Sequence, residues 1–93
     1  MREYEIVFIA HPDLEESALN DVAEKVKSWV TEAGGTVLKA DFWGRRRLAY
    51  AIRKQKEGQY ILLKVQLAPT SVAAIERNLR FQEPVLRFVI SQV

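Results

Sequence analysis

Apolar residues recur at two different spacings along this chain, and the order of the two spacings restricts the fold more than any other feature. Segments in which every second residue, or every residue, is apolar are expected to be strands, and segments with an apolar residue every three or four positions are expected to be helices. The predicted strands are residues 4–10, 36–52, 60–67 and 85–93, and the predicted helices follow residues 13 and 71. The order is therefore strand, helix, strand, strand, helix, strand.

This order predicts the α+β fold class, as a ferredoxin-like split βαβ domain (βαββαβ) with a four-stranded antiparallel sheet and two helices on one face. Right-handed crossovers would put the first and third strands in the centre of the sheet, flanked by the second and fourth. Residues 1–93 suffice for a single domain with its own core. The chain has no cysteine and no apolar stretch long enough to span a membrane, so we expect a cytoplasmic protein without a membrane partner.

Local signals predict where some of these elements begin, end and bend. Asp13 followed by Glu16 resembles a capping box at the start of the first helix, and Gly34-Gly35 supplies its left-handed exit. Gly44, inside the second predicted strand, indicates a β-bulge or a bend. Residues 53–58 are predicted to connect the second and third strands.

The parity of the strands predicts one covered and one open face of the sheet. The face toward the helices would carry Ile6, Phe8, Ile61, Leu63, Val65, Leu86, Phe88 and Ile90, and the open face Val7, Ile9, Tyr60, Leu62, Val85 and Val89, with Lys64 and Arg87. Because an open face this apolar is unusual for a solvated monomer, it indicates a protein partner. The candidate partner residues are Val7, Ile9, Tyr60, Leu62 and Val89. Coverage by the chain's own loops, or self-association, remains the alternative.

Charge is distributed unevenly along the chain. Residues 1–35 hold three basic and eight acidic side chains, whereas residues 36–93 hold eleven basic and four acidic ones. The densest basic segment, Gly44–Arg53, begins with the triplet Arg45-Arg46-Arg47. Guanidinium groups match phosphate oxygens in a bidentate geometry, so nucleic acid is the first partner to consider. A second interpretation is an edge strand whose charges prevent edge-to-edge aggregation.

Within the triplet, Arg45 and Arg47 should share one face of the strand, and Arg46 should point with Leu48 and Tyr50. One of these two sets is expected to brace the fold by pairing with Asp41 or Glu57. In the third strand Tyr60 has no aromatic neighbour along the sequence, so RNA contacts are expected through phosphates rather than through bases stacked on the sheet.

Residue patterns typical of enzymes are missing. His11 is the single histidine, no glycine-rich phosphate loop occurs, and the carboxylates do not cluster as a metal site. We therefore expect no enzyme activity, no cofactor, no metal and no small-molecule substrate.

Three segments carry a resemblance to a known family. They are the run from Gly44 to Arg53, which contains Leu-Ala-Tyr-x-Ile followed by a basic residue, the opening Met1–Val7 with the turn His11-Pro12-Asp13, and the passage Arg80-Phe81-x-x-x-Val85-Leu86-Arg87. These segments occur in the order typical of the bacterial small-subunit ribosomal protein six family, and the sequence resembles that family along nearly the whole chain.

The resemblance implies a structural constituent of the small ribosomal subunit that binds the central domain of small-subunit rRNA. It also implies a heterodimer with small-subunit ribosomal protein eighteen, which would bind the RNA jointly. The candidate RNA-binding residues are Arg2, Arg45, Arg46, Arg47, Arg53, Lys54 and Arg87, acting by charge neutralisation and phosphate contact. The rival hypothesis is a ferredoxin-like regulatory module that homodimerises through its sheet and binds a small ligand.

Overall fold

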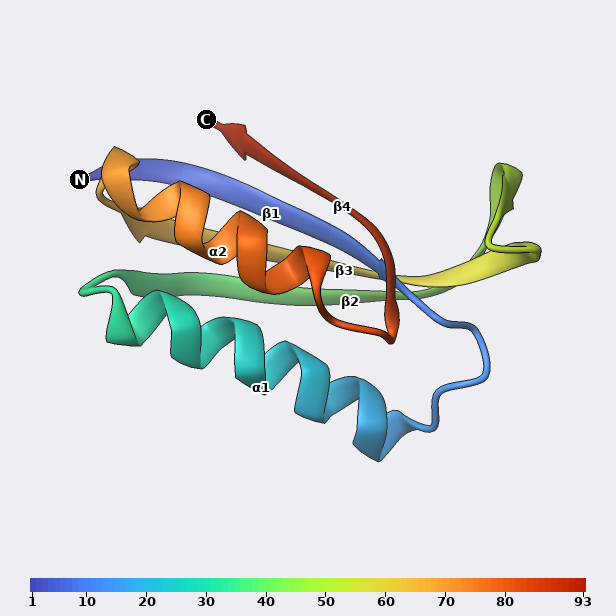
Figure 1. Cartoon of the computed structure of the whole chain (residues 1–93). Helices are drawn as coiled ribbons and strands as arrows, with labels where there is room; N and C mark the ends of the chain where they lie inside the picture. The colour runs from blue at the N-terminus through green and yellow to red at the C-terminus, as the bar shows by residue number, and fades with distance from the viewer.

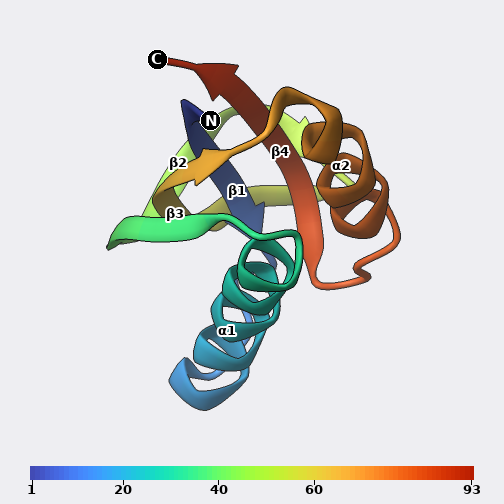
Figure 2. The ribbon, with the colours of Figure 1, turned by 90° about the vertical axis from the view of Figure 1, so that its left-hand side faces the viewer.

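The computed structural model describes all 93 residues and confirms the order of elements expected from the sequence. The elements are β1 (Arg2–Ala10), α1 (Glu16–Glu32), β2 (Thr36–Ile52), β3 (Gln55–Leu67), a 3₁₀ turn (Pro69–Ser71), α2 (Val72–Arg80) and β4 (Val85–Gln92). The strands form one antiparallel sheet in the order β2-β3-β1-β4, so the first and third strands are central, as predicted. Both helices cover the same face of this sheet (Figures 1 and 2).

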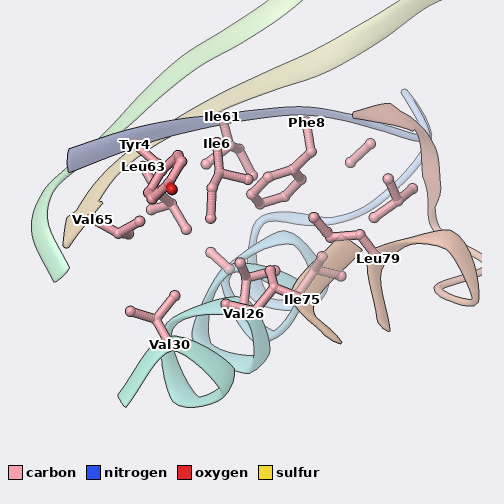
Figure 3. Close-up of a cluster of buried hydrophobic side chains, with 14 of the residues drawn as sticks. Tyr4, Ile6, Phe8, Val26, Val30, Ile61, Leu63, Val65, Ile75 and Leu79 are labelled. Atoms are coloured by element: carbon pink, nitrogen blue, oxygen red, sulfur yellow. The ribbon is translucent and has the colours of Figure 1, made fainter. Parts of the chain in front are cut away.

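The core fills the space between that face and the helices (Figure 3). Ile6 and Phe8 of β1 and Ile61 and Leu63 of β3 are fully buried, because alternate residues of the central strands point toward the helices. Side chains spaced three or four apart on α1 and α2, such as Val26 and Ile75, close the core from below the sheet in Figure 3. Neither helix has the length and apolar character that crossing a membrane would require.

The start of α1 differs from the predicted capping box. Glu15, not Asp13, is the N-cap residue, and no side chain caps the helix there. The backbone N–H of Asp13 instead donates to Nδ1 of His11 at 3.2 Å, which forms a local turn two residues upstream. The end of α1 follows the prediction: Gly34 has a positive φ of 84°, and the N–H of Gly35 reaches back to the carbonyl of Val30 at 2.9 Å.

The β2–β3 hairpin is longer and tighter than predicted. β3 begins at Gln55, so the connection is the two-residue turn Arg53-Lys54, and not residues 53–58. Both turn residues have positive φ angles, 49° and 65°, as a tight hairpin turn requires. The bulge expected at Gly44 is confirmed by a register shift between Phe42 and Gly44 and by a φ of 81°.

The end of this hairpin leaves the plane of the sheet. Pairing between β2 and β3 is interrupted between Arg47 and Ile52, and the strands extend past the rest of the sheet. In Figure 1 this end, coloured green to yellow, bends upward on the side away from α1. We call residues 48–54 the hairpin tip.

The placement of Val85 on the open face was wrong. A register shift between Ile9 and Ala10 pairs Ala10 with Val85, and this shift turns Val85 into the core instead of Leu86. Leu86 is buried but lies outside the main core cluster. The remaining open-face parity is as predicted, since Val7 lies opposite Val89 and Ile9 opposite Arg87.

Candidate nucleic-acid and protein interface

The three adjacent arginines of β2 have three different environments. Arg45 braces the fold: its guanidinium donates to the carbonyl of Pro12 at 2.6 Å, and its Nε lies 3.7 Å from the carboxylate of Glu57. Of the two carboxylates considered as its partner, Glu57 is therefore the correct one, because Asp41 pairs with Lys39 at 3.3 Å. One guanidinium donor of Arg45 and its charge are thus used within the chain.

Gln59 of β3 holds the β1–α1 loop that also contains Pro12. Its side-chain amide donates to the carbonyls of His11 and Leu14, at 3.2 and 3.0 Å. Arg45 and Gln59 are directly opposite each other across the β2–β3 pair. Together they fix the β1–α1 loop against the hairpin, a role that the sequence did not indicate because the acceptors are backbone carbonyls about 45 positions away from Gln59.

Arg46 points to the open face of the sheet, as its parity with Leu48 and Tyr50 predicted. Its guanidinium carbon lies 5.7 Å from the centroid of the Trp43 ring, within range of a cation–π contact. Trp43 in turn stacks against Tyr60, with ring centroids 6.3 Å apart and ring planes 15° apart. Tyr60 therefore does have an aromatic neighbour, which comes from the adjacent strand through the bulge at Gly44.

The side chains of Arg47 and Lys54 are exposed and make no hydrogen bond or ion pair with the rest of the chain. Arg53 donates to the carbonyl of Glu83 at 3.1 Å, and this bond connects the hairpin tip to the α2–β4 loop. Arg87 of β4 donates to the hydroxyl of Tyr50 and lies over the Tyr50 ring, 6.0 Å from its centroid. The tip is thus held to β4 and to the α2–β4 loop by two arginine contacts.

The structure gathers most of the candidate RNA-binding residues at one end of the molecule, but not all of them. Arg46, Arg47, Arg53, Lys54 and Arg87 lie in or beside the hairpin tip, and we call these five residues the basic cluster. Arg2 begins β1 at the opposite end of the sheet, where it donates weakly to Gln92 at 3.4 Å. A nine-residue strand spans roughly 27 Å, so Arg2 cannot join the basic cluster.

An apolar groove lies between the hairpin tip and the open face of the sheet. Its volume is about 260 Å³, and nine of its ten lining residues are hydrophobic. The sheet contributes Val7, Ile9, Tyr60, Arg87, Phe88 and Val89. The hairpin tip contributes Leu48, Ala49, Tyr50 and Ile52.

Four of the five candidate partner residues line this groove, namely Val7, Ile9, Tyr60 and Val89. Leu62 lies on the same face but is only 9% exposed, so it offers little surface to a partner. Leu48, Tyr50 and Ile52 were missed as groove residues. Their alternation with Arg47 and Ala51 was visible in the sequence, but the bend that carries them over the open face was not.

The arrangement offers binding groups. The chain holds no group of three histidine, cysteine or carboxylate side chains close enough to bind a metal ion. His11 has only Asp13 beside it, 3.8 Å from its Nδ1. What the site presents is a set of cations that can contact phosphates or carboxylates, next to a groove that can receive an apolar group.

Comparison with known proteins gives a consistent result. A family model described as ribosomal protein S6 matches residues 3–92. The small ribosomal subunit protein bS6 of Moorella thermoacetica is 40% identical over 93 residues, which cover 100% of this chain and 95% of that protein. The bS6 protein of Streptomyces griseus is 46% identical over 87 residues, covering 94% and 91% of the two chains.

A solved structure agrees with these relatives. The crystal structure of 30S ribosomal protein S6 from Thermotoga maritima superposes with a TM-score of 0.94 at 27% sequence identity. The superposition covers 99% of this chain and 87% of that one. The architecture described above is therefore shared along essentially the whole chain.

Proposed function

The chain belongs to the ribosomal protein S6 family of the small ribosomal subunit, whose place is the bacterial cytoplasm, and from this we propose that it binds small-subunit rRNA jointly with small-subunit ribosomal protein eighteen. It acts as a structural constituent, not as an enzyme. In this proposal the RNA is the central domain of small-subunit rRNA, and the partner protein covers the open face of the sheet.

The observation that carries the proposal is the position of the basic cluster beside the apolar groove. Arg47 and Lys54 have no partner within the chain, so their charges are available to phosphate oxygens. The groove is lined almost entirely by apolar residues, and it lies on the face that the helices leave uncovered. An RNA–protein complex offers both kinds of group, since its phosphates suit the basic cluster and its apolar side chains suit the groove.

Within this proposal the basic residues have different roles. Arg46, Arg47, Arg53 and Lys54 contact phosphates and set the position of the RNA, whereas Arg87 of the basic cluster lines the groove and faces the partner protein. Arg45 supports them by fixing the hairpin against the β1–α1 loop. Arg2 contacts RNA only where the RNA extends along the sheet to its far end. The charges on β2 also protect this edge strand from aggregation, so that the two interpretations of the arginine run apply to the same residues.

The test is binding of the protein to a central-domain rRNA fragment, with protein eighteen present, across a salt series. The double substitution Arg47→Ala/Lys54→Ala should lower the affinity and reduce the slope of log affinity against log salt by about two, one for each lost phosphate contact. The control, Lys25→Ala/Arg77→Ala, removes the same charge from exposed positions on the two helices.

An equal loss of affinity in both double variants would mean that only net charge matters, and not the basic cluster. If neither variant changes the salt slope, phosphate contact by the hairpin is excluded. If the protein binds no RNA in any condition and sediments as a stable homodimer, the ligand-binding module becomes the better description.

A further inference from the structure

The composition of the apolar groove defines what it can bind. We propose that the groove receives one apolar side chain of the partner protein, and that a carboxylate next to that side chain in the partner's sequence pairs with Arg87. The inference rests on the proposed function, because it takes the partner to be small-subunit ribosomal protein eighteen. It adds the chemistry of the segment by which that partner docks.

The groove has room for one large side chain. A closed apolar cavity of about 150 Å³ can hold a benzene ring, and the volume here is about 260 Å³. Its floor is the central pair of strands, with Val7 and Ile9, and its outer wall is the hairpin tip, with Leu48 and Tyr50. Such a shape suits an aliphatic or aromatic side chain that enters from the open face.

The charge at the groove indicates which kind of residue should lie next to that side chain in the partner's sequence. Arg87 is the one charged residue among the ten that line the groove. Its guanidinium now contacts the neutral hydroxyl of Tyr50 and leaves donors free, since a guanidinium has five N–H groups in a fixed fork. Arg46 adds a second positive charge on the same face, above Trp43. A carboxylate is therefore the complementary group, because it accepts two parallel hydrogen bonds from one guanidinium.

A second copy of this chain is a poor occupant. If two copies met groove on groove, the lining of the second copy would offer Arg87 no carboxylate, so this charge would be covered without a partner. The two ends of the chain do not fill the groove either. The N–H of Val93 bonds to the carbonyl of Glu3, and both ends lie at the side of the sheet opposite the hairpin tip (Figure 1).

A nucleobase is also less suited than a side chain. A base presents hydrogen-bonding edges over most of its outline, and nine of the ten groove residues have no polar side-chain atoms or only the hydroxyl of a tyrosine to satisfy them. The unpaired cations Arg47 and Lys54, which suit phosphates, lie outside the groove lining. The groove and the cations thus favour different partners.

Calorimetric titration with protein eighteen, in the absence of RNA, tests the inference. Val89 is 49% exposed at the groove, and Val89→Phe would fill the groove with the protein's own ring. Val93→Phe is the matched control, since Val93 is 63% exposed and lies outside the groove. Arg87→Met removes the guanidinium and keeps an apolar stem, and Arg77→Met on the exposed side of α2 removes the same charge elsewhere. Thermal unfolding of each variant confirms that it is folded.

We expect Val89→Phe and Arg87→Met each to weaken the partner's binding by at least about tenfold, the loss typical of one charge-assisted hydrogen bond or one buried side chain. Val93→Phe and Arg77→Met should bind within about twofold of the unchanged protein, because neither residue lines the groove. The weakening caused by Arg87→Met should also shrink at high salt, because it is electrostatic.

Any of three results would overturn the inference while the proposed function stands. The first two are normal binding of protein eighteen by Val89→Phe, or by Arg87→Met. The third is weaker binding of the rRNA fragment by Val89→Phe when protein eighteen is absent. The last result would make the groove an RNA site. If the unchanged protein fails to bind protein eighteen at all, both the inference and the proposed heterodimer are wrong. The two failures are therefore distinguishable.

Discussion

At the scale of single residues, neighbouring arginines of one strand do different things. Arg45 is tied to a backbone carbonyl, Arg46 lies against an indole ring, and Arg47 is free. Strand parity predicted which of them share a face, but it could not say which of them are used within the fold. The acceptor of Arg45 is the carbonyl of Pro12, which the β1–α1 loop brings to the hairpin only in the folded chain.

The first prediction separates the bracing arginine from the free one. Arg45→Ala should lower the free energy of unfolding by about 1 kcal/mol, because it removes a charge-assisted hydrogen bond and a half-exposed ion pair. Arg47→Ala should change it by less than about 0.5 kcal/mol, as expected for a surface residue without contacts. Urea unfolding of both variants measures the difference. Equal losses would show that the contact with Pro12 contributes nothing.

The second prediction concerns the two glycines that follow α1. A Cβ at Gly35 would overlap the carbonyl oxygen of Gln66 and crowd the side chain of Leu67, whereas a Cβ at Gly34 would meet open space. Gly35→Ala should therefore cost about 3 kcal/mol of unfolding free energy, because the backbone must move. Gly34→Ala should cost only about 1 kcal/mol, from its positive φ. Thermal unfolding of both variants measures the two losses of stability. A larger loss for Gly34→Ala than for Gly35→Ala would contradict this packing.

At the scale of elements, the hairpin tip combines binding groups with an unfavourable backbone. Arg53 and Lys54 both occupy positive φ, where asparagine and glycine are preferred. A basic pair at these positions costs stability and places two cations at the extreme end of the molecule. Two polar contacts hold the tip back over the sheet, from Arg53 to the carbonyl of Glu83 and from Arg87 to the hydroxyl of Tyr50.

The third prediction is that Arg53→Asn/Lys54→Gly raises stability and lowers RNA affinity together. The free energy of unfolding should rise by about 1 kcal/mol, because relief of two residues at positive φ outweighs the loss of the exposed hydrogen bond from Arg53 to Glu83. The salt slope of RNA binding should fall by up to about two. Arg53→Ala/Lys54→Ala is the control, since it removes the same charges without relieving the backbone. A double variant that is more stable and binds RNA with an unchanged slope would exclude the turn from the RNA contact.

Elements with a clear period were predictable from the sequence, and the geometry at their ends was not. Each element buries one face, and that face repeats along the local sequence. It appears as alternation in β1 and β3, and as the spacing of Leu19, Val22 and Val26 in α1. The turn at Arg53-Lys54, the bulge that buries Val85 and the bend of the hairpin tip depend on pairing between distant strands. For the same reason the residue types of the site were predictable, but the groove was not.

At the scale of the whole molecule, charge is separated in space as it is along the chain. The exposed carboxylates of α1, such as Glu16, Asp21 and Glu24, lie on the helical side, and the basic cluster lies at the hairpin end. A charge distribution of this kind orients the protein toward a polyanion before contact. We therefore expect the hairpin end to face the RNA, and the helices to face away from it.

The fourth prediction follows from this separation. The association rate with the rRNA fragment should fall steeply between low and physiological salt, because steering acts over about one Debye length. Reversing three charges on α1, Glu16→Lys/Asp21→Lys/Glu24→Lys, should raise the overall positive charge and yet leave the position of bound RNA unchanged. Stopped-flow rates and hydroxyl-radical footprints measure the two quantities. A footprint that moved toward α1 would contradict the assigned orientation.

The measurement that tests joint recognition most directly is the affinity of this protein for a central-domain rRNA fragment with and without protein eighteen at one fixed salt concentration. The partner should tighten binding by at least about tenfold, a coupling within the usual range for two ligands that bind at different sites of one protein. Val89→Phe should abolish most of that gain while leaving the weak binding without the partner unchanged. Equal affinity with and without protein eighteen would contradict joint recognition, and would leave a protein that binds RNA on its own.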